Sequence, residues 1–379
     1  MSFYITENEF DIKNNRHYEG LFCLGNGYIH TRASVEEGFE NDDQSNEYMR
    51  LPTNTTLEKF REGKSKWGTY MPGFMAMHPL LKEEIVNLPY FLDLKVYIDG
   101  QRFTLEGAEI VSYERTLDMK NALLIRRMHV RFNGNELNLY FERFLSAGVK
   151  NLSAQKLCIA SEVPCKIDIV GGIDAGVRTN GFNHFTQVKI LTKDFPCLEI
   201  ESNKGEICHI CSKLVGKAGL LSSFEDTVYT GEKLHFENSN AVSVYKFAAI
   251  SSSRDDFDCF ATLQDALKAG YDRLKMEHCV LWQKAWESAD IEIKGDERSQ
   301  FAVRVAIYHL MRNRSDDPRV SVCAKGYAGD AYFGRCFWDS EIFLLPFYIN
   351  NFPDTAKNIL LFRYNTLDGA RQNANNYGY

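Results

Sequence analysis

The hydrophobic pattern of this 379-residue chain changes period near residues 251–256, and this change constrains the fold more than any other feature. From about residue 85 to 250, apolar and polar residues alternate, and turn residues separate the runs. After Ser251-Ser-Ser-Arg-Asp-Asp256 the period becomes helical. Alternation predicts half-buried antiparallel strands, whereas the helical period predicts amphipathic helices. We therefore expect a β domain followed by an α domain.

Two hairpins are predicted in the β region by their turn residues. Asp99-Gly100 separates the runs 91–98 and 101–105, and Asn133-Gly134 separates the runs 123–132 and 137–144. Asp-Gly and Asn-Gly are preferred sequences of two-residue hairpin loops. Further strands are expected at residues 151–160, 165–170, 184–191, 197–201, 207–214 and 241–250. So many short strands predict a large antiparallel β-sandwich over residues 1–255.

The helical part is predicted to begin with a linker over residues 256–295. This linker contains at least one long helix, with Trp282 and Trp286 near one stripe. Further helices are expected at 297–312, at 337–349 with an interruption at Pro346, and from Pro353 to residue 367.

Composition excludes several classes of protein. Hydrophobic residues make up 44 % of the chain and aromatics 13 %, which supplies a large core and excludes disorder. The net charge of -7, without a basic stripe, disfavours nucleic acid as a partner. The N-terminus lacks a signal-peptide pattern, and no run reaches the roughly 18 apolar residues that span a bilayer. We expect a cytoplasmic protein with no membrane partner.

The ten cysteines are dispersed through apolar runs, as reduced core thiols are. The segment Cys208-His209-Ile210-Cys211 alone has spacing like that of a metal site. It lacks a second ligand pair, and strand alternation places Cys208 and Cys211 on opposite faces. The sequence therefore predicts no metal site.

A cluster of aromatic and acidic residues between Gly329 and Phe343 has the composition of a sugar-binding site at a helix entrance. Aromatic faces stack on pyranose rings and carboxylates accept hydrogen bonds from hydroxyls, so Trp338 beside Asp339 offers both contacts. The alternative is an amphipathic helix start with buried aromatics, because five apolar residues fall at helical spacing. These five are Phe337, Ile342, Phe343, Leu344 and Phe347.

This cluster, and motifs along the whole chain, resemble the α-glucoside phosphorylases of glycoside hydrolase family 65. The motifs occur in the family's order. They are Leu24-Gly-Asn-Gly27-Tyr28 with Arg32 and Val35-Glu-Glu-Gly38; Asn87-Leu-Pro89 and Asp93 to Gly100; Arg115-Thr-Leu-Asp118; Gly172-Ile-Asp174 with Val177-Arg178; Trp282, Trp286 and Ala289-Asp290; Gly295-Asp296; Phe337-Trp338-Asp339; and Arg363-Tyr364 through Ala370-Arg371.

The resemblance implies a β-sandwich, a helical linker and then an (α/α)6 barrel with the active site at its mouth. Residues 296–379 hold only three to five helices at roughly 11 to 12 residues per helix plus connections, not the twelve of such a barrel. We therefore expect this chain to contain an incomplete barrel, with the family's catalytic acid and phosphate-holding residues beyond Tyr379. No catalytic residue is assigned within the chain.

The resemblance further implies a donor-sugar subsite. Trp338 would form a stacking wall and Asp339 would accept hydrogen bonds from glucose hydroxyls, with Tyr332 and Phe337 as weaker members. Arg335 stands where many relatives have His, and its longer, permanently charged side chain implies a different acceptor specificity.

The implied reaction is phosphorolysis of an α-linked glucose disaccharide by inorganic phosphate, with inversion, to β-glucose 1-phosphate and a sugar. No cofactor and no metal are implied. Two alternatives stay open: a family 65 hydrolase that uses water, and a catalytically dead fragment that binds sugar or dimerises.

Two other motifs have competing interpretations. Gly25-Asn-Gly27 lacks the spacing of a phosphate loop and is interpreted as a turn. Arg363 and Arg371 lie in helical surroundings, which favours structural pairing with acidic residues over phosphate binding.

An incomplete barrel also predicts association. Its exposed helix faces would leave an apolar patch well above the few hundred Å² that monomers tolerate, so we expect a homodimer, larger oligomers or poor solubility. Light scattering tests this expectation, and a monodisperse monomer would contradict it.

Overall fold

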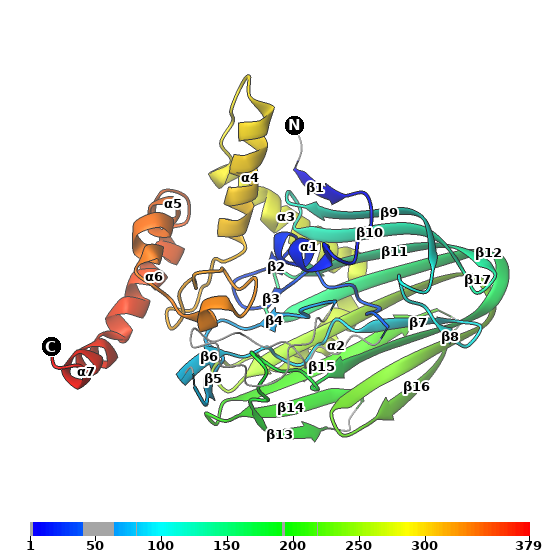
Figure 1. The fold of residues 1–379 in the computed structure, drawn as a ribbon, viewed down its shortest axis with the longest axis horizontal. Coiled ribbons are helices and arrows are strands. Elements are labelled where there is room, and N and C mark those ends of the chain that lie inside the picture. The colour runs from blue at the N-terminus through cyan, green and yellow to red at the C-terminus, as the bar shows by residue number, and fades with distance from the viewer. Residues whose placement is uncertain (1–2, 41–63, 81, 192–193, 218) are drawn as a thin grey trace.

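A computed structural model of the chain describes residues 3–40, 64–80, 82–191, 194–217 and 219–379. A large twisted antiparallel sheet fills one side of the molecule, and helices follow it in the chain (Figure 1). The last helices step away from the sheet toward the C-terminus. The predicted order, a β domain and then an α domain, is confirmed.

The main sheet contains twelve strands in the described part of the chain. Its principal path runs β1-β9-β10-β11-β12-β17-β15-β14-β13, and β7, β8 and β16 pair beside it. The bounds are β1 Tyr4–Glu7, β7 Leu94–Ile98, β8 Gln101–Arg102, β9 Glu109–Asp118, β10 Leu123–Phe132, β11 Asn135–Leu145, β12 Leu152–Asp174, β13 Phe185–Ile190, β14 Cys197–Ser202, β15 Ile207–Gly216, β16 Leu220–Glu225 and β17 Tyr229–Ser252. Short sheets join β2 Leu24–Gly25, β3 His30–Thr31 and β4 Thr69–Tyr70, and β5 Met75–His78 with β6 Lys82–Ile85.

Two long strands, β12 and β17, make the sheet fold onto itself as a sandwich. The first half of β12 pairs with β11, and its second half pairs with β7. One core cluster joins side chains of both layers, including Met128 and Leu139 from one and Val96 and Ile169 from the other. The predicted β-sandwich is therefore confirmed.

The predicted break between two strands near residues 160–165 is wrong, because β12 is continuous. The β12–β17 register shifts between Ala160 and Cys165 and again before Ile167. Pro164 lies in this irregular stretch, and proline, which cannot donate to a ladder, is tolerated at bulges. A β-bulge therefore interrupts the register of β12 at the place where the sequence predicted one strand to end and the next to begin.

Both predicted hairpins form at their expected turns. Asp99 and Gly100 have φ of 49° and 81°, and Asn133 and Gly134 have φ of 50° and 76°. Two successive positive φ angles match the twist of the flanking strands, and Asn, Asp and Gly adopt them at low cost.

The linker contains two helices, α2 Cys259–Ala269 and α3 Tyr271–Ala289, which separate at Gly270 with φ 77° and ψ 161°. The other helices are α1 Asn15–Leu21, α4 Glu297–Met311, α5 Leu345–Asn351, α6 Pro353–Asn365 and α7 Leu367–Asn376. A 3₁₀ turn spans Ala331–Gly334, and a π-helical turn spans Ser340–Leu344. Among the described residues, no helix is both long and apolar enough for a bilayer.

Helix α3 is fixed to two turns of the sandwich by His278. Its Nε2 donates to the carbonyl oxygen of Asn121 at 2.8 Å, and its Nδ1 accepts the backbone N–H of Ala147 at 3.1 Å. This pattern requires a neutral ring. Burial lowers the pKa of His278 to about 4. Trp286, two turns further along α3, donates to the carbonyl oxygen of Met119 at 2.8 Å.

We predict that His278 makes the fold sensitive to acid. The unfolded ring titrates near pH 6.5 and the folded ring near 4, so the unfolded state gains a proton first and stability falls between these values. A shift of this size corresponds to about 3 kcal/mol. Urea unfolding of His278→Gln across this pH range should show a smaller loss than the wild type. His17→Gln, at an exposed histidine, is the control and should keep the full loss.

Candidate functional site: the aromatic loop and its support

The N-terminal glycine motif supports the end of α4 by close backbone contact. A Cβ on Gly27, which has φ of 86°, would lie 1.6 Å from the carbonyl oxygen of Arg314. A Cβ on Gly25 would lie 2.9 Å from the carbonyl oxygen of Arg312. Gly25-Asn-Gly27 is therefore a packing surface for the chain that leaves α4, a role that spacing along the sequence does not reveal.

Asn26 and Arg32 extend this support in two directions. The Asn26 amide donates to the carbonyl oxygens of Ser146 and Lys150, both at 2.8 Å, which ties the motif to the β11–β12 turn. The Arg32 guanidinium donates to the carbonyl oxygen of Ala328 and forms an ion pair with buried Glu19. The loop before the aromatic cluster is thus held by the N-terminal segment.

The aromatic cluster begins with a strained turn. Tyr332, Phe333 and Gly334 have successive φ angles of 59°, 61° and 68°. Such angles are costly for aromatic residues, and strain of this kind gathers at functional sites. The turn packs tightly on β6, since a Cβ on Gly334 would lie 2.5 Å from the Cβ of Ile85.

The residues predicted to bind sugar lie together on this turn and the entrance of the next helix. Trp338 is 72 % exposed, and Asp339 beside it is exposed, with a side chain that makes no hydrogen bond or ion pair with the described residues. The rings of Tyr332 and Phe337 meet edge to face at 5.9 Å. The backbone N–H of Arg335 donates to the carbonyl oxygen of Tyr332 at 3.0 Å, and its guanidinium lies over the ring of Phe333 at 4.9 Å.

The π-helical turn that follows is fixed by Arg363 from α6. Arg363 donates to both carboxylate oxygens of Glu341 at 2.8 and 2.9 Å and to the carbonyl oxygen of Phe337 at 2.6 Å. Arg371 pairs with Asp368 at 3.0 Å. Structural pairing of both arginines is confirmed. The sequence did not indicate that Arg363 positions this turn. The signal that could have shown it is the acidic residue Glu341 on the turn itself.

These groups form a surface suited to one face of a sugar ring. The exposed indole offers stacking area, and the adjacent carboxylate offers acceptors to hydroxyl groups. Phe343, one turn further, is also 71 % exposed, whereas Phe347 packs against other helices. The interpretation of the aromatics as an ordinary buried helix start therefore fits Phe347 but not Trp338 or Phe343.

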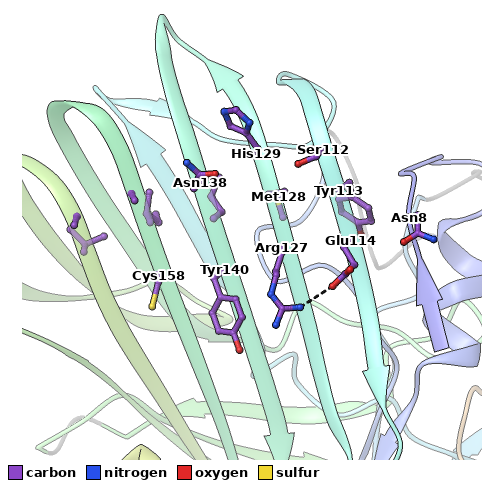
Figure 2. Close-up of a pocket in the computed structure, with 15 residues that line it drawn as sticks. Asn8, Ser112, Tyr113, Glu114, Arg127, Met128, His129, Asn138, Tyr140 and Cys158 are labelled. Carbon is purple, nitrogen blue, oxygen red and sulfur yellow. Dashed lines mark hydrogen bonds and ion pairs between the residues drawn. The ribbon is translucent and has the colours of Figure 1, made fainter. Parts of the chain in front are cut away.

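A separate groove lies on the sheet and is lined by none of the residues predicted to bind sugar. Figure 2 shows this groove of about 740 Å³, which crosses β9, β10, β11 and β12. Arg127 and Glu114 pair across its floor at 2.8 Å, and Tyr140 lies beside them. The pairing on adjacent strands is typical of a solvated sheet face.

Comparison with solved structures places this fold in a class. A structure described as a kojibiose phosphorylase from the human microbiome superposes with a TM-score of 0.85 over 98 % of this chain and 50 % of that chain, at 20 % sequence identity. The shared class is a large antiparallel sandwich joined by helices to the start of an α domain.

Sequence comparison then defines the family. Residues 5–285 match the description "Glycosyl hydrolase family 65, N-terminal domain", and residues 304–379 match "Glycosyl hydrolase family 65 central catalytic domain". The chain belongs to glycosyl hydrolase family 65, which confirms the resemblance seen in its motifs.

Curated relatives carry phosphorylase names. The chain is 32 % identical to a kojibiose phosphorylase of Halothermothrix orenii, with 99 % of this chain and 49 % of the relative covered. It is 27 % identical to a maltose phosphorylase of Bacillus subtilis, covering 99 % and 50 %, and 28 % identical to an alpha,alpha-trehalose phosphorylase of Thermoanaerobacter brockii, covering 99 % and 51 %. The chain spans about half the length of these relatives.

The packing role of the glycine motif predicts unequal costs for two similar substitutions. Gly27 and Gly100 both have φ near 80°, but a Cβ on Gly100 meets nothing within 4 Å. Gly100→Ala should therefore cost only about 1 kcal/mol of backbone strain. Gly27→Ala must also displace the Arg314 carbonyl, and we expect at least about 2 kcal/mol more from this overpacking. Urea unfolding measures both, and equal costs would refute the packing role.

Proposed function

We propose that this chain belongs to an inverting α-glucoside phosphorylase. The reaction takes an α-linked glucose disaccharide and inorganic phosphate to β-glucose 1-phosphate and the free acceptor sugar. The names of the relatives support this, since kojibiose, maltose and trehalose are all disaccharides of glucose in α linkage.

The observation that carries the proposal within this chain is the exposed pair Trp338 and Asp339 on a rigid support. In the proposed role, the indole stacks on the glucose ring and the carboxylate accepts hydrogen bonds from its hydroxyls. Arg363 binds the carbonyl oxygen of Phe337 before the pair and the carboxylate of Glu341 after it, which fixes the chain on both sides. A site of this kind needs support because small displacements of a bound sugar slow the reaction strongly.

Inversion needs two further groups. A carboxylic acid protonates the leaving glycosidic oxygen, while phosphate attacks the anomeric carbon from the opposite face. We propose that this acid and the phosphate-binding groups lie in the part of the relatives' length that this chain does not span. Phosphate itself is the nucleophile, so the proposed reaction uses no metal and no organic cofactor.

The reaction is tested by incubating four disaccharides, namely kojibiose, maltose, nigerose and trehalose, with inorganic phosphate. Two proteins are compared, this chain and the full-length product of the gene that encodes it. Formation of β-glucose 1-phosphate by the second protein supports the proposal, and formation by this chain would refute the assignment of the acid outside it. Glucose release without phosphate would establish a hydrolase instead.

The subsite is tested in whichever of these proteins is active. Trp338→Ala should lower kcat/KM by about 100-fold or more, because the lost stacking and positioning act in the transition state. Asp339→Asn should also lower it, since the amide replaces a charged acceptor. Tyr4→Ala removes a half-exposed aromatic on β1, remote from the loop in Figure 1, and should leave kcat/KM unchanged. A Trp338→Ala enzyme with normal kinetics would exclude the stacking role.

A further inference from the structure

Three cysteines that are distant in the sequence meet in the core between the sheet and helix α2. Cys197 on β14 and Cys211 on β15 are cross-strand partners, and their sulfur atoms lie 2.6 Å apart. Cys259, the first residue of α2, brings its sulfur to 3.1 Å from that of Cys211. All three sulfur atoms lie within 4.8 Å of one another, and all three residues are buried.

The three thiols contact one another within a cluster of hydrophobic residues. Their cluster is otherwise apolar, with Phe195, Phe247 and Leu263 among its members. Hydrogen bonds from Cys197 and Cys211 are the main cause that lowers the pKa of the Cys259 thiol, and the Ser251 hydroxyl adds another. The N-terminal end of α2 also favours negative charge at this position.

The separations suit a shared cation after a small adjustment. Two sulfur ligands of a tetrahedral site with metal–sulfur bonds of about 2.3 Å lie about 3.8 Å apart. The observed contacts of 2.6 and 3.1 Å are shorter than this value, so the sulfur atoms must move apart by about 1 Å to hold an ion. Thiolate ligands select soft cations such as Zn²⁺ and Cu⁺.

We propose that Cys197, Cys211 and Cys259 form a trithiolate site for one thiophilic d¹⁰ cation. Each residue binds as a thiolate, so every thiol that is protonated before binding releases its proton, and nothing is oxidised or reduced. The bound ion links α2 to the β14–β15 pair, so it stabilises the attachment of the linker to the sandwich. This site differs from the sequence-based candidate, because Cys208 faces another core cluster with Ile200 and Ile210.

The proposal is tested by titrating the fully reduced chain with Cd²⁺, whose thiolate charge-transfer band in the ultraviolet reports sulfur ligands. We expect one tight equivalent, proton release and a rise in Tm. Cys197→Ala, Cys211→Ala and Cys259→Ala should each weaken binding by at least about 100-fold, as loss of a ligand exceeds loss of an outer contact. Cys208→Ala, at an equally buried thiol of β15, should keep it.

Two results would overturn the site. One is tight Cd²⁺ binding that is retained in each of the three single variants. The other is a thiol count of eight rather than ten in the unreduced, unfolded chain, with mass mapping of a Cys197–Cys211 disulfide and no metal binding after reduction. If the variants fold poorly, X-ray absorption of the Cd²⁺-loaded wild type decides the question, because fewer than three sulfur ligands excludes a trithiolate.

Discussion

A buried network of three arginines and three glutamates underlies the organisation of this chain. The arginines project from neighbouring strands β9, β10 and β11, and the glutamates come from the N-terminal segment. The pairs are Arg115 with Glu7 at 2.7 Å, Arg126 with Glu37 at 2.5 Å, and Arg143 with Glu36 at 2.5 Å. Burial by itself would raise the pKa of Glu36, but the charges of Arg143 and Arg126 overcome this effect and lower it. The charges balance, and removal of one partner would leave an uncompensated buried ion at a cost of about 3–5 kcal/mol.

This network also positions the aromatic loop, which lies far later in the sequence. Arg143 donates to the carbonyl oxygens of Ser34 and Arg32 at 2.9 and 3.0 Å, so it fixes the backbone of the N-terminal segment as well as Glu36. The side chain of Arg32 then holds the carbonyl oxygen of Ala328. The surface around Trp338 is therefore supported by the sandwich, and the β domain is part of the site's architecture.

The differences between expectation and structure arise where tertiary contacts outweigh local pattern. The sequence predicted at least one long helix in the linker but not where α2 ends, which Gly270 sets with its φ of 77° before the long helix α3 begins. Pro164 indicated a strand end, but the long β17 partner continues past it and keeps β12 in register on both sides. The cysteines at 197, 211 and 259 gave no spacing signal, since their proximity depends on the β14–β15 register and on where α2 packs. By contrast, the two hairpins and the order of domains were correctly predicted, because turn chemistry and periodicity are local.

The sequence by itself determined the β-then-α organisation, the hairpin turns and the family, because periodicity, turn residues and ordered motifs are written along the chain. It also singled out Trp338 and Asp339 by composition. Only the tertiary structure decided that these two residues are exposed side by side. It also decided that the Arg314 carbonyl packs against Gly27, where a side chain would not fit, and that three thiols lie in one core cluster. These facts depend on distances between segments far apart in the sequence, which are set by packing and by the buried ion pairs.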